Sequence, residues 1–217
     1  MNRFLDRISY KFRRICIPNL MLYIVIATAA VYITEMFVQN VSLTNYIYFN
    51  RTYILTGEWW RVITWLFVPS TNRIVGIIFS LYISWFVGSN LENAWGSFKF
   101  NLYYLIGVIA TVAGGFITGY TTNLYLNTSL FFAFATLYPK AEMRLFFFLP
   151  IQAKWLALVD FVFFVFAFIV GTWSDRVAII AALLVFVLFF YEDMGKNIKN
   201  QVYYFKHRNK YKNNWRK

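Results

Sequence analysis

The chain has 217 residues, of which 60% are apolar and 14% charged, against roughly 45–50% and about 25% in ordinary globular domains. Aromatic residues alone make up 23%. No water-soluble core of this size could hide so many apolar side chains, so the composition excludes a soluble enzyme, a disulfide-rich secreted scaffold and a disordered chain. The single cysteine, Cys16, leaves no intramolecular disulfide and no thiolate metal site.

Long apolar runs predict an all-α membrane protein, because a segment that crosses hydrocarbon must satisfy its own backbone hydrogen bonds. The six predicted spans are residues 18–38, 74–93, 101–119, 123–138, 152–171 and 177–191. The fourth and sixth are short for about 30 Å of hydrocarbon at about 1.5 Å per residue. The first run continues past Ala30 without a break, which favours a membrane anchor over a cleaved signal peptide.

The 21 lysines and arginines are unevenly distributed along the chain. With six spans, both basic tails lie on one side of the membrane, together with Lys99, Lys140, Arg144 and Lys154. The other side holds Arg51, Arg61, Arg73 and Arg176. The positive-inside rule then places both termini in the cytoplasm. Few external lysines and no disulfide favour a bacterial inner membrane.

Two tails flank the membrane domain that we predict at residues 18–192. The segment 1–17 has apolar residues at helical spacing between basic ones, which is typical of an amphipathic helix on an anionic leaflet. The tail 193–217 interleaves tyrosines and a tryptophan with lysine and arginine. This pattern allows base stacking on nucleic acid, but a juxtamembrane tail on acidic lipid explains it more simply. We therefore expect membrane lipids, and not nucleic acid, as its partner.

The segment 39–73 between the first two spans is too apolar for a free loop. It combines Trp59, Trp60 and Trp65 with many tyrosines and isoleucines, and it carries charges at Glu58 and Arg61. Tryptophan and tyrosine prefer the headgroup level, and irregular backbone at membrane depth needs protein around it. The segment is therefore predicted to be partly embedded in the membrane.

Four stretches of the chain match the motifs of one known membrane-protein family, in the same order along the sequence. They are Trp60-Arg61-x-x-Thr64, residues 79–88, Glu92-x-x-x-Gly96-Ser97 and residues 145–156. Together they resemble the rhomboid superfamily, which includes intramembrane serine proteases and inactive derlin-like members. The resemblance covers roughly residues 18–190. It implies a six-helix bundle with a membrane-embedded first loop, anchored by Trp60 and Arg61.

The resemblance also shows what a rhomboid protease would need and this chain lacks. Active members carry a serine nucleophile in a Gly-x-Ser-Gly motif on the fourth span and a histidine base on the sixth. Here Ser129 follows Thr128 without either glycine, and the single histidine is His207 in the C-terminal tail. The family's histidine and asparagine on the second span match Gly76 and Ser80. A serine hydroxyl is a poor nucleophile without an adjacent proton acceptor, so the resemblance implies a protease that has lost its chemistry.

The acids inside the predicted spans are the remaining candidates for chemistry. Asp160 lies within the fifth span, and an intramembrane acid is a functional hypothesis by default. A catalytic pair of Ser129 with Asp160 is the weak alternative to a structural Asp160. For Glu92, and for Gly96 after it, the resemblance implies a structural role at a helix end or the embedded loop. No His, Cys or carboxylate cluster has metal-ligand spacing, so we expect neither metal nor cofactor.

These observations favour a rhomboid-like pseudoprotease that binds transmembrane segments of client proteins without cleaving them. Asn127, Ser129, Gly76 and Ser80 would line the former active-site cavity, near Asp160. Two alternatives stay open: a rhomboid serine protease that uses Ser129, and a small transporter or channel. The sequence does not indicate an oligomeric state.

Overall fold

The computed structural model describes residues 16–38, 42–145 and 149–190 of the chain. The long helices are α2 (Leu20–Phe37), α6 (Ile74–Trp95), α7 (Ser97–Thr118), α8 (Leu124–Leu137), α9 (Ala153–Val170) and a final helix, Trp173–Phe190. The short elements are α3 (Leu43–Ile47), β1 (Phe49–Asn50), α4 (Arg51–Leu55), α5 (Arg61–Thr64), the 3₁₀ turn η1 (Trp65–Phe67), β2 (Tyr120–Thr121), β3 (Glu142–Leu145) and β4 (Leu149–Gln152). The predicted amphipathic segment and basic tail fall almost wholly on residues 1–15 and 191–217, outside the described residues.

Five of these helices are long and apolar enough to cross a membrane, namely α2, α6, α7, α9 and the final helix. The prediction of a mostly helical, multi-pass membrane protein is confirmed at this level. The fourth predicted span is a helix as well, but α8 has only 14 residues. At about 1.5 Å per residue its length is about 21 Å, which is less than the hydrocarbon thickness.

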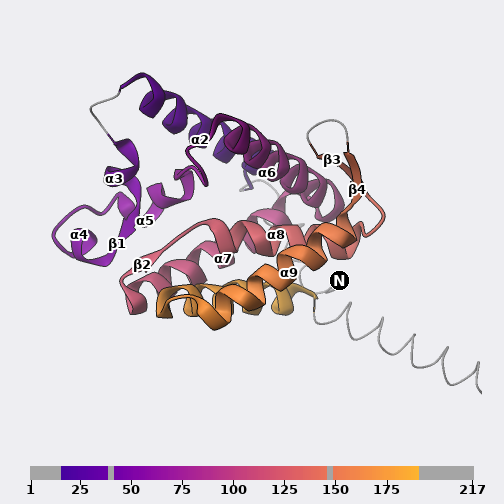
Figure 1. Cartoon of the computed structure of the whole chain (residues 1–217). Coiled ribbons are helices and arrows are strands. Elements are labelled where there is room, and N and C mark those ends of the chain that lie inside the picture. The colour runs from indigo at the N-terminus through magenta and orange to yellow at the C-terminus, as the bar shows by residue number, and fades with distance from the viewer. Residues whose placement is uncertain (1–15, 39–41, 146–148, 191–217) are drawn as a thin grey trace, which may run out of the picture.

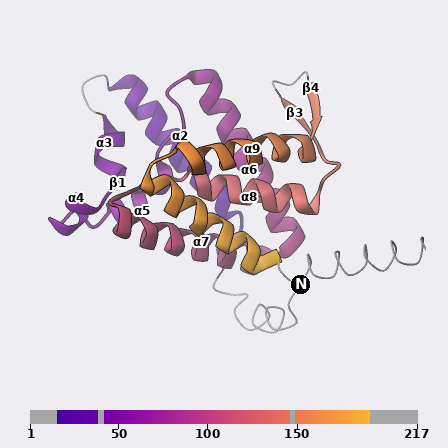
Figure 2. The same ribbon diagram turned by 60° about the horizontal axis from the view of Figure 1, so that its bottom comes forward.

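The helices run back and forth between two ends of the bundle (Figures 1 and 2). The segment from α3 to η1 lies at one end, and the hairpin of β3 and β4 lies at the other. Helix α6 packs along α2, and α8 packs against both α6 and α9. Because the chain alternates, Lys99, Lys140 and Lys154 belong to the hairpin end, whereas Arg61 and Arg176 belong to the opposite end.

Two small antiparallel sheets were not expected from the sequence. In the first, Phe49 of β1 pairs with Thr121 and Asn50 pairs with Tyr120 of β2. The segment from α3 to η1, called the outer segment below, is therefore bonded to the turn between α7 and α8. In the second, β3 and β4 form a hairpin in which Arg144 is the partner of Pro150. Proline is tolerated there because the hairpin has only edge strands. This hairpin forms most of the connection between α8 and α9.

Helix α8 is the central element of the bundle, since most of its side chains are buried. Its neighbour α7 approaches closely because small residues face inward: a Cβ on Gly107 would meet Leu126 of α8 at 2.5 Å. A Cβ on Gly115 would meet the fully buried ring of Phe49 at 2.7 Å. Close helix contact through small residues is typical of membrane bundles. Here it brings both α8 and the outer segment against α7.

The crossing of α2 and α6 gives a first prediction. A Cβ on Gly88 would lie 2.5 Å from the Cβ of buried Met21, and neither backbone can yield easily. We expect Gly88→Ala to lower the free energy of unfolding by about 1–3 kcal/mol, as overpacking does. Gly76→Ala is the matched control in the same helix, because there the close atom is a methyl of the movable Thr71 side chain. Thermal unfolding in detergent measures both, and equal melting temperatures would contradict the packing argument.

Candidate functional site

Arg61 is the centre of the outer segment between α2 and α6. Its side chain is only 3% exposed although Arg61 is the first residue of the short helix α5. Nη1 donates to the carbonyl oxygens of Asn45 (2.9 Å) and Tyr48 (3.0 Å), and Nε donates to Glu58 Oε2 at 2.6 Å. The guanidinium also lies 5.0 and 4.8 Å from the ring centres of Tyr48 and Tyr53. One cation therefore satisfies two backbone carbonyls, a carboxylate and two aromatic faces.

The other residues of the Trp-Arg-x-x-Thr pattern bond the same stretch of backbone. Trp60 Nε1 donates to the carbonyl of Tyr46 at 3.1 Å, and Thr64 Oγ1 donates to the carbonyl of Ile47 at 3.0 Å. Asn123, just before α8, donates from Nδ2 to the carbonyls of Leu66 (3.1 Å) and Val68 (2.9 Å). The outer segment is thus held internally by side chains, and is attached to the start of α8.

Glu92 and Gly96 lie at the opposite end of the bundle, where α6 turns into α7. Glu92 is buried, and its Oε1 accepts hydrogen bonds from the backbone N–H of Asn19 (2.8 Å) and from Ser97 Oγ (2.6 Å). Asn19 is the residue before α2, so Glu92 satisfies an unpaired N–H at a helix start. Gly96 has φ +81°, a conformation that favours glycine, and its N–H bonds to the carbonyl of Glu92. Within the described residues, both therefore bond helix ends.

A cavity of about 370 Å³ lies between α6, α8 and α9. Its polar lining consists of Ser70, Ser80, Ser84, Asn127, Thr128 and Asp160. Apolar residues of the same three helices, among them Phe79, Leu130 and Val159, form the rest of the wall. Three predicted site residues, Ser80, Asn127 and Asp160, are therefore brought together.

Two predicted cavity residues do not belong to this cavity. Ser129 is 1% exposed and faces α7: its Oγ donates to the carbonyl of Leu126 at 2.7 Å and accepts from the hydroxyl of Tyr103 at 3.2 Å. Successive helical residues are rotated by about 100°, so the face that presents Asn127 and Thr128 to the cavity turns Ser129 away. Gly76 lies against Thr71 rather than in the cavity lining. The structure therefore does not bring Ser129 into the cavity that Asp160 lines.

The cavity has unused hydrogen-bonding capacity. Ser70 donates to Ser80 at 2.7 Å, and Thr128 donates to the carbonyl of Leu124 at 2.9 Å. Within the described residues, by contrast, the Asp160 carboxyl has no hydrogen bond or ion pair. Asn127 Oδ1 is buried without a partner in the same part of the chain. Buried polar groups are normally paired, so the buried Asn127 Oδ1 and the partly buried Asp160 carboxyl are the acceptors of this cavity that a ligand could bond.

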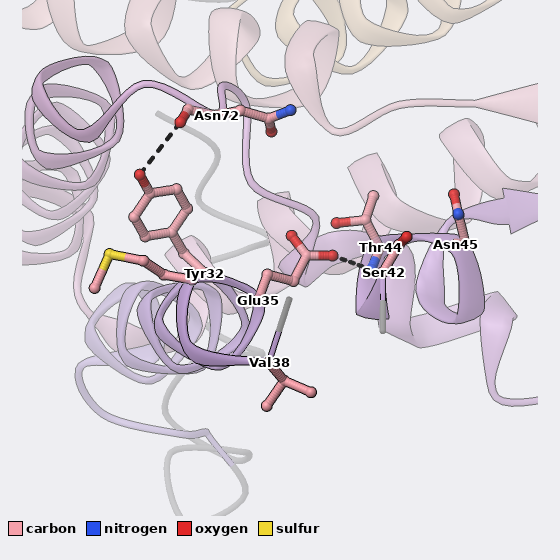
Figure 3. A pocket seen from close by; sticks show the side chains of 8 residues that line it. Tyr32, Glu35, Val38, Ser42, Thr44, Asn45 and Asn72 are labelled. Carbon is pink, nitrogen blue, oxygen red and sulfur yellow. Dashed lines mark hydrogen bonds between the residues drawn. The ribbon is translucent and has the colours of Figure 1, made fainter. Parts of the chain in front are cut away.

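A second pocket, of about 470 Å³, lies at the outer end of α2 (Figure 3). Glu35 points across it and accepts from the backbone N–H of Thr44 at 2.5 Å, and the Tyr32 hydroxyl donates to the carbonyl of Asn72 at 3.3 Å. Val38 and Ser42, which flank residues 39–41, also line it. The Glu35 carboxylate already links α2 to α3 through this hydrogen bond, so its role in the pocket is structural.

One polar cluster had no role in the sequence-based prediction. Asp175 Oδ2 accepts from the backbone N–H of Thr172 at 2.9 Å, and Thr172 Oγ1 accepts from the Asp175 N–H at 3.3 Å. This reciprocal pair caps the final helix, and the Thr-x-x-Asp spacing is the signal that could have identified it. Asp175 Oδ1 also accepts from the Tyr125 hydroxyl at 2.9 Å, which joins α8 to the final helix. Burial first, and then the charge of Asp175, raise the pKa of nearby Tyr120.

Among the described residues no group of three His, Cys, Asp or Glu side chains could hold a metal ion. A scan against models of known protein families gave no match for the chain, and neither did a search of curated proteins. The outer segment and the cavity are therefore the features of this molecule that bear on its function.

The Arg61 contacts give the second prediction. Removing the side chain by Arg61→Ala leaves the Asn45 and Tyr48 carbonyls and Glu58 without their donor, so we expect a loss of about 2–4 kcal/mol of stability. Protease access to the outer segment should rise in parallel. Arg51→Ala is the control, because Arg51 belongs to the same segment and is exposed. If both variants melt at the same temperature, Arg61 does not hold the segment.

Proposed function

We propose that this protein is a rhomboid-like pseudoprotease of the membrane that binds transmembrane segments of client proteins. The proposal combines the rhomboid resemblance with six helices, of which α8 is short and central. In this arrangement α8 counts as the fourth span, and the outer segment is the embedded first loop. Arg61, Trp60 and Thr64, the residues of the rhomboid-like pattern, all bond the backbone of that segment.

The observation that carries the proposal is the cavity between α6 and α9. Both helices pack on α8, but they do not pack closely against each other. Val159 lines the cavity from α9 and is half exposed. A third helix can therefore lie in the gap between α6 and α9 with its apolar side chains against Ile83, Leu156 and Val159. Packing of this kind, together with interhelical hydrogen bonds, drives helix association in bilayers.

The contacts of Ser129 support binding without cleavage. Its hydroxyl hydrogen is used toward the carbonyl of Leu126, and the group that bonds its oxygen is the Tyr103 phenol, a donor rather than a base. A nucleophile needs a proton acceptor within hydrogen-bond reach and an open path to substrate. Ser129, at 1% exposure, has neither among the described residues.

Site-specific photo-crosslinking tests the binding. A photoreactive amino acid at position 159 should crosslink to the transmembrane segment of co-expressed single-span proteins, since Val159 lines the cavity. The same probe at position 158 is the matched control, because Leu158 is equally exposed but lies on a different face of α9. Equal yields at the two positions would contradict binding in the cavity.

Activity-based labelling gives the third prediction. We expect the purified full chain to show no fluorophosphonate labelling at Ser129 and no cleavage of a panel of transmembrane substrates. Ser129→Ala should leave crosslinking at position 159 within about twofold of the unaltered protein, because Ser129 does not line the cavity. Stoichiometric labelling that disappears in Ser129→Ala would instead establish the serine protease alternative. A membrane flux that depends on Asp160 would establish the transporter alternative.

A further inference from the structure

The strongest unexplained feature of the molecule is Asp160, a carboxyl in the middle of a membrane-spanning helix. It is the eighth residue of the 18-residue helix α9, about 11 Å from the helix start at about 1.5 Å per residue. It is the one charged residue among those that line the cavity. An unpartnered acid at this depth is costly, and such residues usually mark a binding or transport site.

The polar groups around Asp160 define what the ligand must provide. The Asp160 carboxyl and Asn127 Oδ1 are acceptors without a donor in the described part of the chain. The hydroxyls of Ser80 and Thr128 already take part in hydrogen bonds of their own. The unpartnered acceptors of the cavity are thus a carboxyl and an amide oxygen, and beside a carboxylate the complementary donor is a cation.

The chain itself does not supply that cation from its described spans. Lys99, Lys154 and Arg176 are the basic residues of these helices, and each lies in the first turn of its helix. None is therefore near the depth of Asp160, so the same residues of a second copy would not reach it either. Among the described residues, therefore, no spanning helix supplies the donor, and under the proposed function a client membrane protein is its source.

We propose that Asp160, supported by Asn127, selects client transmembrane segments that carry a lysine or arginine near the middle of the span. This inference rests on the proposed function and specifies the client that the cavity recognises. A basic residue and an acid that are both already inside the membrane gain an ion pair on association, while much of the cost of burying each was incurred at insertion.

The test uses the full chain, with the photoreactive probe at position 159, reconstituted in lipid vesicles with synthetic single-span peptides. The peptides have a 20-residue leucine–alanine span that carries a central lysine, a lysine one turn from one end, a central glutamine, or no polar residue. We expect the central lysine to raise the crosslinking yield about fivefold or more over the plain span, in line with polar contacts between membrane helices. The terminal lysine should give no increase, and glutamine a smaller one.

Variants of Asp160 separate recognition from folding. Asp160→Asn keeps the shape and should reduce the central-lysine yield to that of the plain span. Asp160→Lys paired with a peptide that carries a central glutamate should restore it, which a merely misfolded protein would not do. Equal yields for the lysine and plain spans, or a central-lysine yield unchanged in Asp160→Asn, would overturn the inference and leave the proposed function standing. If no span crosslinks above the position-158 control, both the inference and the proposed function fail.

Discussion

A backbone carbonyl without a partner in regular structure needs a donor from elsewhere, and this constraint governs the outer segment, which is bonded to the turn before α8. Between α2 and α6 the chain forms only short helices, so many of its carbonyls have no partner within a helix and need donors from elsewhere. Arg61 supplies two of them, to Asn45 and Tyr48, while Thr64 and Asn123 supply others. A guanidinium suits this task because its fixed, forked donors reach several acceptors at once and it stays charged when buried.

The anchored segment makes a short central helix possible. Since α8 is shorter than the hydrocarbon is thick, its first turn would leave polar groups at membrane depth without cover. The contacts from Asn123 to the carbonyls of Leu66 and Val68, and the pairing of β1 with β2, place the outer segment over this turn. Helices α6 and α9 both pack on α8 rather than on each other, and the cavity lies between them. The outer segment and the cavity are therefore parts of one arrangement.

Hydrophobicity determined much of this fold, and that part was predictable from the sequence. All six expected spans are helices, with starts displaced by four residues at most, as in the final helix that begins at Trp173. The direction in which the Ser129 side chain points was not predictable. Successive residues of a helix are rotated by about 100°, so a small change in the orientation of α8 decides whether this side chain faces α7 or the cavity. That choice depends on which helices surround α8. The β3–β4 hairpin was not predictable because each strand has only four residues and the sequence between them contains no glycine, asparagine or aspartate that would mark a turn.

The acids of the spanning helices show why Asp160 differs from the others. Glu35, Glu92 and Asp175 lie near helix ends, and each accepts a backbone N–H at the start of a helix, from Thr44, Asn19 and Thr172 respectively. Such N–H groups are unpaired in any helix and attract negative charge, so these three acids have structural roles. In the middle of α9 every neighbouring N–H is already used within the helix. A carboxyl at that position can only be satisfied from outside its own element, and among the described residues nothing satisfies it. Under the proposal its partner approaches through the gap between α6 and α9, where the client helix would lie.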